Sequence, residues 1–251
     1  MSTRNNPLAE RESPWLCYVT DRRSLPVVSS ADSIAALTQK IAEVAAAGVD
    51  WVQIREKDLT ARELASLTQQ SLRIAATSCA KSSCAARVLV NDRLDVAVAE
   101  RADGVHLSGK SLPVREAKRL IQSAMAKQAV GKSFLVGASC HSLEAAKAAE
   151  HDGADYIFFG PIFSTPSKSA FGTPQGLAGL AQVCRGVSIP VLGIGGITLD
   201  NAASCLHAGA VGLAAIRLFQ DAIDPISTVR QIHQLVTGFR RRQSPPGRTR
   251  G

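Results

Sequence analysis

Short apolar runs alternate with segments of helical periodicity along most of the chain. Ile34, Leu37 and Ile41 recur on one face of a predicted helix, and Thr60 with Glu63 forms a Thr-x-x-Glu capping box before the next helix. The predicted strands are Leu16–Thr20, Val49–Ile54, Arg87–Val90, Gly104–Leu107, Phe134–Ala138, Ala154–Phe159, Pro190–Gly193 and Gly212–Ile216. The predicted helices are Ile34–Ala47, about Thr60–Thr77, Leu94–Arg101, one from near Pro113, one through Ala149, Gly176–Cys184, Asp200–Ala208 and one after Pro225. Eight strand–helix pairs at this spacing predict an α/β fold, a single (β/α)8 TIM barrel.

The composition suits that fold. The chain has 251 residues, a common size for a single α/β barrel domain, and 45% of them are hydrophobic. Only 4% are aromatic, so Ala, Val, Leu and Ile must fill most of the core. Parallel strands covered by helices have this character. We expect a flexible leader at residues 1–14 and one barrel domain at 15–238.

The net charge of +8 is concentrated at one end. Five arginines lie in the segment RRRQSPPGRTRG, and +8 less these five leaves +3 for the rest of the chain. The segment has no apolar face and two adjacent prolines, so we expect residues 239–251 to be a disordered basic tail. The chain offers no aromatic platform for stacking bases, and we expect no specific nucleic-acid partner.

The six cysteines are scattered, with no CxxC pair and no spacing typical of zinc ligands. The first residues are polar and lack the apolar core of a signal peptide. No apolar run approaches the ~18 residues of a membrane span. We therefore expect a cytoplasmic protein without a membrane partner. The sequence leaves the oligomeric state open, a homo-oligomer included.

A long segment after the sixth predicted strand, Phe158–Leu177, has no helical or strand periodicity. It contains turn-forming residues, several hydroxyls and one cation, Lys168. Hydroxyls, backbone N–H groups and a lysine together suit an anionic group such as a phosphate. A solvated loop rich in Ser and Pro is the alternative.

Polar residues recur where the predicted strands end. Gln53, Arg55 and Lys57 alternate at strand period, which predicts that their side chains point the same way. Asn91–Asp92 and Ser139 stand at equivalent places after later strands. Because βα loops at the C-terminal rim of a (β/α)8 barrel build active sites, we expect these groups to converge there.

Six ordered segments resemble thiamine phosphate synthase and the related thiazole tautomerase (TenI-like) proteins, more closely the synthase. They are VQIREKD (52–58), VNDRLDVA (90–97), ADGVHL (102–107), VGASCHS (136–142), DYIFFGPIFSTPSK (155–168) and IPVLGIGGIT (189–198). The resemblance implies a transferase of thiamine biosynthesis, which joins a hydroxymethylpyrimidine diphosphate to a thiazole phosphate and releases diphosphate. It also implies a Mg2+ cofactor.

The resemblance also implies roles for individual residues. Arg55, Lys57 and Lys168 match cations that hold the diphosphate, and Gln53 and Asn91 match further substrate contacts. Asp92 matches a magnesium ligand, and Ser139 a serine near the pyrimidine. The groups matching contacts to the thiazole phosphate are Thr165, Ser167, Gly195, Gly196 and Ile216.

Two positions depart from the family pattern. Ser111 stands where a second magnesium carboxylate is expected, and serine is a weaker ligand for Mg2+. Arg217 stands where a serine is common beside the thiazole phosphate, and it could bind phosphate or fill the pocket. Asp21, Glu56 and Asp58 lie near strand ends, and one of them could compensate for the missing carboxylate.

The tautomerase branch also carries serine at the position of Ser111, and there a histidine that matches His141 acts as acid and base. A non-catalytic protein that binds thiazole or thiamine phosphate is a third hypothesis. The Asn-Asp and Thr-Pro-Ser-Lys segments favour the synthase.

Overall fold

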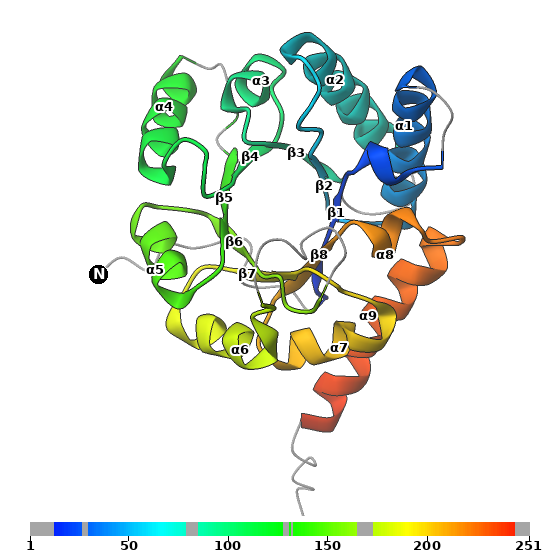
Figure 1. The fold of residues 1–251 in the computed structure, drawn as a ribbon, viewed down its shortest axis with the longest axis vertical. Coiled ribbons are helices and arrows are strands. Elements are labelled where there is room, and N and C mark those ends of the chain that lie inside the picture. The colour runs from blue at the N-terminus through cyan, green and yellow to red at the C-terminus, as the bar shows by residue number, and fades with distance from the viewer. Residues whose placement is uncertain are drawn as a thin grey trace, which may run out of the picture.

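The computed structural model describes residues 13–26, 30–78, 85–127, 131, 133–164 and 173–243. Its eight strands form a closed parallel barrel in the order β1 to β8, and β8 pairs with β1 (Figure 1). The strands are β1 (Trp15–Val19), β2 (Trp51–Ile54), β3 (Arg87–Asn91), β4 (Gly104–Leu107), β5 (Leu135–Cys140), β6 (Tyr156–Phe159), β7 (Val191–Ile194) and β8 (Gly212–Ala215). The predicted (β/α)8 barrel is confirmed.

Helices form a ring outside the barrel wall (Figure 1). They are α1 (Ser30–Ala47), α2 (Ala61–Ser78), α3 (Leu94–Ala99), α4 (Val114–Ala126), α5 (Leu143–His151), α6 (Gly176–Gly186), α7 (Leu199–His207), α8 (Arg217–Gln220) and α9 (Pro225–Gln243), with a 3-10 turn, η1, at Arg22–Ser24. The capping box at the start of α2 is confirmed, because Glu63 accepts from the Thr60 N–H at 2.8 Å and Thr60 Oγ1 accepts from the Glu63 N–H at 3.3 Å.

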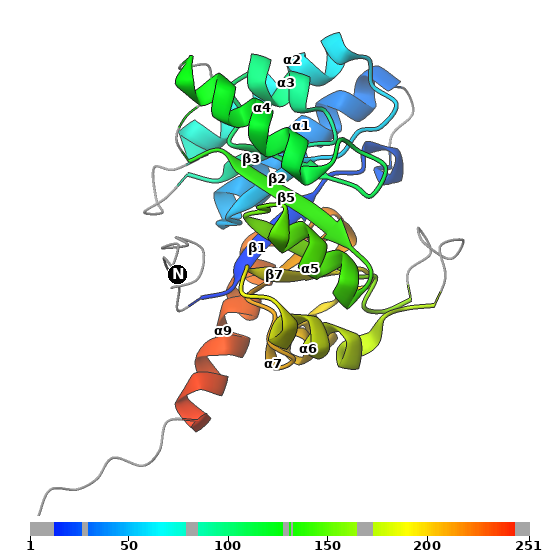
Figure 2. The ribbon, with the colours of Figure 1, turned by 90° about the vertical axis from the view of Figure 1, so that its left-hand side faces the viewer.

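Most element bounds differ from the sequence-based prediction by a few residues, and three differences bear on the site or on the domain limits. β5 continues to Cys140, so Ser139 lies inside the strand, paired with Phe158, and not after it. The short helix α8 directly after β8 was not predicted. α9 lies against α1 and α7. It continues to Gln243, so the backbone is still helical at 239–243, where disorder was expected (Figure 2). Residues 1–12 and 244–251 lie outside the described residues.

The inside of the barrel contains much of the chain's small aromatic content. Trp51 is fully buried, stacked on Trp15 with ring centroids 5.3 Å apart and tilted against Tyr156 at 4.7 Å. Tyr156 also packs against Phe158 and needs space from β5: a Cβ on Gly137 would lie 2.1 Å from the Tyr156 ring. Large rings from β2 and β6 therefore fill the interior beneath the rim, and β5 carries glycine where the ring passes.

Three aspartates tie neighbouring strands together at their N-terminal ends. Asp50, Asp103 and Asp155 each come just before an even-numbered strand, β2, β4 and β6. Their carboxylates accept main-chain N–H groups from the preceding odd-numbered strand: Leu16 at 2.8 Å, Val88 at 2.8 Å and Val136 at 2.7 Å. The corresponding residue before β8 is Val211, which has no carboxylate. This aspartate hydrogen bond is therefore found before β2, β4 and β6 but not before β8.

Candidate active site

A row of hydrogen bonds runs along the C-terminal ends of β2 and β3. Gln53, which is buried in β2, donates from Nε2 to Asn91 Oδ1 of β3 at 2.8 Å. Asn91 in turn donates from Nδ2 to Asp92 Oδ2 at 2.8 Å. Three residues that the sequence placed in one site are thus joined side chain to side chain.

Asp92 continues the row to the loop after β4. Its carboxylate accepts the Ser108 N–H at 2.7 Å, the Ser108 hydroxyl at 3.2 Å and the Ser111 hydroxyl. Burial opposes ionisation of this carboxyl, but the hydrogen bonds from Ser111, Ser108 and Asn91 outweigh it and hold the pKa below its ordinary value. Asp92 also has a φ of 61°, a left-handed conformation that few non-glycine residues adopt. The loop therefore holds an ionised carboxylate at the rim.

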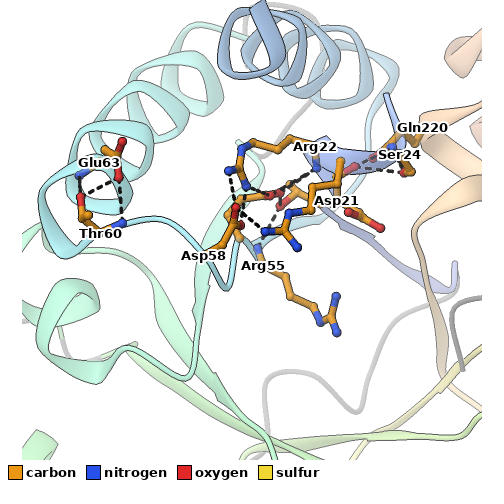
Figure 3. A network of polar contacts seen from close by, with 11 residues as sticks. Asp21, Arg22, Ser24, Arg55, Asp58, Thr60, Glu63 and Gln220 are labelled. Carbon is orange, nitrogen blue, oxygen red and sulfur yellow. Dashed lines mark hydrogen bonds and ion pairs between the residues drawn. The ribbon is translucent and has the colours of Figure 1, made fainter. Parts of the chain in front are cut away.

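Arg55 and Lys57 follow directly after β2 ends at Ile54. Only Gln53 lies within the strand, and the two cations lie in the segment after it. The prediction that all three side chains point the same way by strand alternation therefore does not apply to Arg55 and Lys57. The Arg55 side chain extends away from the neighbouring cluster of charged residues (Figure 3). Within the described residues, no hydrogen bond or ion pair is formed by the side chain of Arg55 or of Lys57. Their charges are thus unpaired among the described residues.

Ser139 belongs to a buried polar chain that the sequence reasoning missed. Its hydroxyl lies 2.9 Å from His106 Nε2, and His106 Nδ1 lies 3.2 Å from the Tyr156 hydroxyl. His106 is 1% exposed and lies against Phe158, with ring centroids 4.2 Å apart. The available signal was a single imidazole within the otherwise apolar strand segment GVHL.

His141 lies one residue beyond β5, and its Nδ1 contacts the main-chain oxygen of Gly160. A carbonyl oxygen only accepts, so Nδ1 carries the proton in this contact. The residue is exposed at the rim, near the start of the loop that follows β6. Its ring is therefore held by the main chain after a neighbouring strand.

Gly195 and Gly196 follow β7 and both have positive φ, 99° and 67°. A Cβ on Gly195 would lie 2.6 Å from Pro161 Cα, and one on Gly196 would lie 2.7 Å from the Ser164 main-chain oxygen. Phe163 donates its N–H to the Gly195 oxygen at 3.0 Å. Glycine is required here because the loops after β6 and β7 touch through their backbones.

The other predicted contacts fall in two groups. Ile216 is the N-cap of α8, and Arg217, the first residue of that helix, is exposed. Thr165, Ser167 and Lys168 lie outside the described residues.

Two of the three proposed substitute carboxylates, Glu56 and Asp58, are held by another cation. Glu56 and Asp58 are both bound by Arg22, at 3.1 and 2.6 Å. The residues that the structure describes contain no cluster of three or more His, Cys, Asp or Glu side chains able to hold a metal ion. Asp92 is thus the carboxylate of this row, and Ser111 stands beside it as a hydroxyl. The described helices include none long and apolar enough to cross a membrane.

Comparisons with known proteins point to one family. Residues 24–219 match the family model described as thiamine monophosphate synthase. A thiamine-phosphate synthase from Roseiflexus sp. (strain RS-1) is 36% identical over 236 residues, which is 94% of this chain and 91% of the relative. One from Moorella thermoacetica is 38% identical over 195 residues, 78% of this chain and 86% of the relative.

Two solved structures are similar to this chain, to different degrees. Thiamine phosphate pyrophosphorylase from Pyrococcus furiosus matches with a TM-score of 0.72 and 30% identity, covering 89% of this chain and 96% of that one. A 3-hexulose-6-phosphate synthase from Salmonella typhimurium matches with a TM-score of 0.61, covering 89% of this chain and 99% of that one. At 17% identity the second likeness shows the fold alone.

Proposed function

The chain belongs to the thiamine monophosphate synthase family, and we propose that it joins a hydroxymethylpyrimidine diphosphate to a thiazole phosphate with release of diphosphate. The observation that carries the proposal is the row from Gln53 through Asn91 and Asp92 to Ser108 and Ser111, with Arg55 directly after the strand that carries Gln53. A polar rim that combines an ionised carboxylate with cations unpaired within the described ranges suits a charged diphosphate.

Neutralising the departing charge is the main demand of this reaction. Loss of diphosphate leaves a pyrimidine-stabilised carbocation, which the thiazole nitrogen captures. We assign Arg55, Lys57 and Lys168 to the diphosphate, where preorganised cations stabilise charge as it develops. Gln53, Asn91 and Ser139 contact substrate, and the backbone of Gly195, Gly196 and Ile216, with Thr165 and Ser167, takes the other phosphate. Arg217 is exposed at that end and adds a cation to it.

The residues present fit a magnesium ion that is shared with substrate. Mg2+ is usually bound by one or two carboxylates together with substrate phosphates and water, and a full cage of protein ligands is not needed. Asp92 supplies one ionised carboxylate, and the Ser111 hydroxyl is its nearest additional oxygen on the β4 loop. When bound, the ion would neutralise charge on the diphosphate oxygens. The protein's own part is to keep Asp92 ionised and in place.

The direct test is purified protein with both substrates and Mg2+, with thiamine phosphate measured as product. Arg55→Gln should lower kcat/KM by about 100-fold, because one preorganised charge at the reacting centre is lost. Arg119→Ala, on the exposed face of α4, is the matched control and should leave the rate unchanged. No thiamine phosphate from the wild-type protein, even at high Mg2+, would end this proposal.

A tautomerase remains the alternative that one observation favours, namely serine at position 111. That function predicts isomerisation of a thiazole carboxylate phosphate without metal, strongly reduced in His141→Ala. Synthase activity that survives His141→Ala, with no isomerisation, argues against it.

The free cysteines bear on location. Cys17, Cys140 and Cys205 are buried thiols, and burial raises the pKa of the Cys140 thiol to about 12. The described cysteines, Cys184 included, form no disulfide, which suits a reducing compartment, so we assign the enzyme to the cytoplasm.

A further inference from the structure

A buried charged cluster joins the end of β1 to the turn after β2, directly behind Arg55 (Figure 3). Its centre is Glu56, only 5% exposed. Glu56 accepts the Thr20 hydroxyl at 2.6 Å, the Arg22 main-chain N–H at 3.2 Å and Arg22 Nη1 at 3.1 Å. A buried carboxylate with this many donors holds the two chain segments in one fixed relation.

The Thr20 hydroxyl connects this carboxylate to the backbone of Arg55. Thr20 is fully buried, and its Oγ1 accepts the Arg55 main-chain N–H at 2.9 Å. A backbone N–H only donates, so the single hydroxyl proton of Thr20 is directed to Glu56. Arg55 is therefore anchored through its backbone while its guanidinium extends away from the cluster.

The cluster balances its own charge. Arg22 binds Asp58 through two hydrogen bonds of 2.6 Å, and Arg23 binds the same carboxylate at 2.8 Å. Two arginines thus face Glu56 and Asp58. These carboxylates, although adjacent in sequence to Arg55 and Lys57, are occupied by other cations. Among the residues that the structure describes, the Arg55 guanidinium therefore has no carboxylate partner.

The 3-10 turn that carries Arg22 is also held from the opposite side. Gln220 of α8 is 4% exposed and donates from Nε2 to the Asp21 main-chain oxygen at 2.9 Å and to Ser24 Oγ. Tyr18 fixes Gln220 by donating its hydroxyl to Oε1 at 2.9 Å. The turn is therefore a rigid support for Glu56.

We propose that Glu56, acting through Thr20, is a positioning residue that fixes Arg55 for the diphosphate of the pyrimidine substrate. The inference rests on the proposed function, in which Arg55 binds that group. Glu56 itself does not face the substrate, because its oxygens are turned to Thr20 and Arg22.

The test compares Thr20→Val with Thr20→Ser. Valine has nearly the shape of threonine but cannot link Arg55 to Glu56, whereas serine keeps the hydroxyl. We expect Thr20→Val to raise KM for the pyrimidine diphosphate, and Kd for inorganic diphosphate with Mg2+, by about tenfold, the scale of one misplaced charged contact. KM for the thiazole phosphate should stay within about twofold, and Thr20→Ser should restore wild-type values.

Glu56→Gln gives a second route to the same result. The amide keeps an oxygen for Thr20 but presents an NH2 group toward the Arg22 donors, so diphosphate affinity should fall in the same selective way. Glu63→Gln, in the capping box of α2, is the matched control and should change only thermal stability.

Unchanged diphosphate Kd and KM in folded Thr20→Val and Glu56→Gln would overturn the inference, whatever happens to stability. So would equal losses for both substrates, because these indicate a general structural role. Calorimetry with inorganic diphosphate keeps the two proposals separate. Wild-type protein that binds diphosphate but makes no thiamine phosphate contradicts the proposed reaction alone, and wild-type protein that binds no diphosphate contradicts both.

Discussion

At the scale of single residues, Asp92 is the rim residue whose ionised state depends most on its neighbours. It must remain charged while partly buried, and its neighbours supply four donors: Asn91 Nδ2, the Ser108 N–H and hydroxyl, and the Ser111 hydroxyl. The hydrogen bonds lower its pKa, although burial alone would raise it. Ser111 therefore serves Asp92 as a donor, a role that an aspartate at this position would not fill.

Exchanging that donor for a carboxylate gives a prediction about metal dependence. In Ser111→Asp two carboxylates would share the site and repel one another until a cation binds between them. We expect the Mg2+ concentration for half-maximal rate to fall by about tenfold, and the melting temperature without metal to fall. Initial rates and thermal unfolding over a Mg2+ series measure both effects. Ser111→Ala, which removes the donor but adds no charge, should not lower the Mg2+ requirement; an unchanged requirement in Ser111→Asp would show that position 111 is no metal site.

Glycine at position 195 gives a second prediction at this scale. Gly195 and Gly48 have similar positive φ, 99° and 97°, but only Gly195 meets neighbouring backbone where a Cβ would stand. Gly48→Ala should cost about 1 kcal/mol of unfolding free energy, from backbone conformation alone. Gly195→Ala should cost more and also raise KM for the thiazole phosphate, because the loop after β6 must move. Urea unfolding and steady-state kinetics test the pair; equal effects in the two variants would contradict the argument.

At the scale of elements, polar side chains form hydrogen bonds between neighbouring strands at both ends of the barrel. At their N-terminal ends, Asp50, Asp103 and Asp155 each bond the N–H of a neighbouring strand. At the C-terminal ends, Gln53 bonds Asn91, and Asn91 bonds Asp92. Hydrogen bonds at both ends fix the register of adjacent parallel strands, which in turn aligns the residues of the rim.

The hydrogen bond from the Val88 N–H to Asp103 predicts different effects for two substitutions of Asp103. Asp103→Ala leaves the Val88 N–H without its acceptor and should lower the free energy of unfolding by about 1–3 kcal/mol. Asp103→Asn keeps an acceptor oxygen and should be close to wild type at pH 7. Urea denaturation of both variants tests this, and equal losses would show that the charge, and not the hydrogen bond, matters.

The Asp103 pKa also predicts how the stability difference between wild type and Asp103→Asn depends on pH. Burial raises this pKa above its ordinary value, against the hydrogen bond from Val88. The folded protein thus binds the proton more tightly than the unfolded chain, so this contribution to stability is present at low pH and is lost as the pH rises through the raised pKa. Asparagine loses nothing over that interval. The stability of Asp103→Asn relative to wild type should therefore increase as the pH rises from the ordinary carboxyl pKa through the raised value.

At the scale of the whole molecule, periodicity was enough for the fold, because eight strand–helix pairs admit few architectures. It also located the rim, since Gln53, Asn91 and Asp92 stand at strand ends in the sequence itself. It could not reveal which side chains pair across strands: Glu56 and Asp58, candidates for a metal site from their position alone, are held by Arg22 from β1's end. The hydrogen-bonded chain Ser139–His106–Tyr156 also joins different strands, so the sequence did not reveal it. In the sequence, His106 is a single polar residue within an otherwise apolar strand.

The C-terminal boundary of the domain gives the last prediction. α9 closes the helical ring against α1 and α7, with Val229 and Ile232 buried, and it continues to Gln243. A chain ending at Gln243 should therefore keep its melting temperature within about 2 °C and its kcat, while binding more weakly to an anionic resin because two arginines are lost.

A chain ending at Asp224 is the contrasting variant. It removes all of α9, including two buried aliphatic side chains worth about 1.5–3 kcal/mol each, and should unfold at a much lower temperature. Thermal scans and steady-state kinetics on both truncations test the boundary. Loss of activity in the chain ending at Gln243 would mean that residues 244–251 take part in the reaction and are not a dispensable basic tail, because the helix that supports the barrel is intact in that chain.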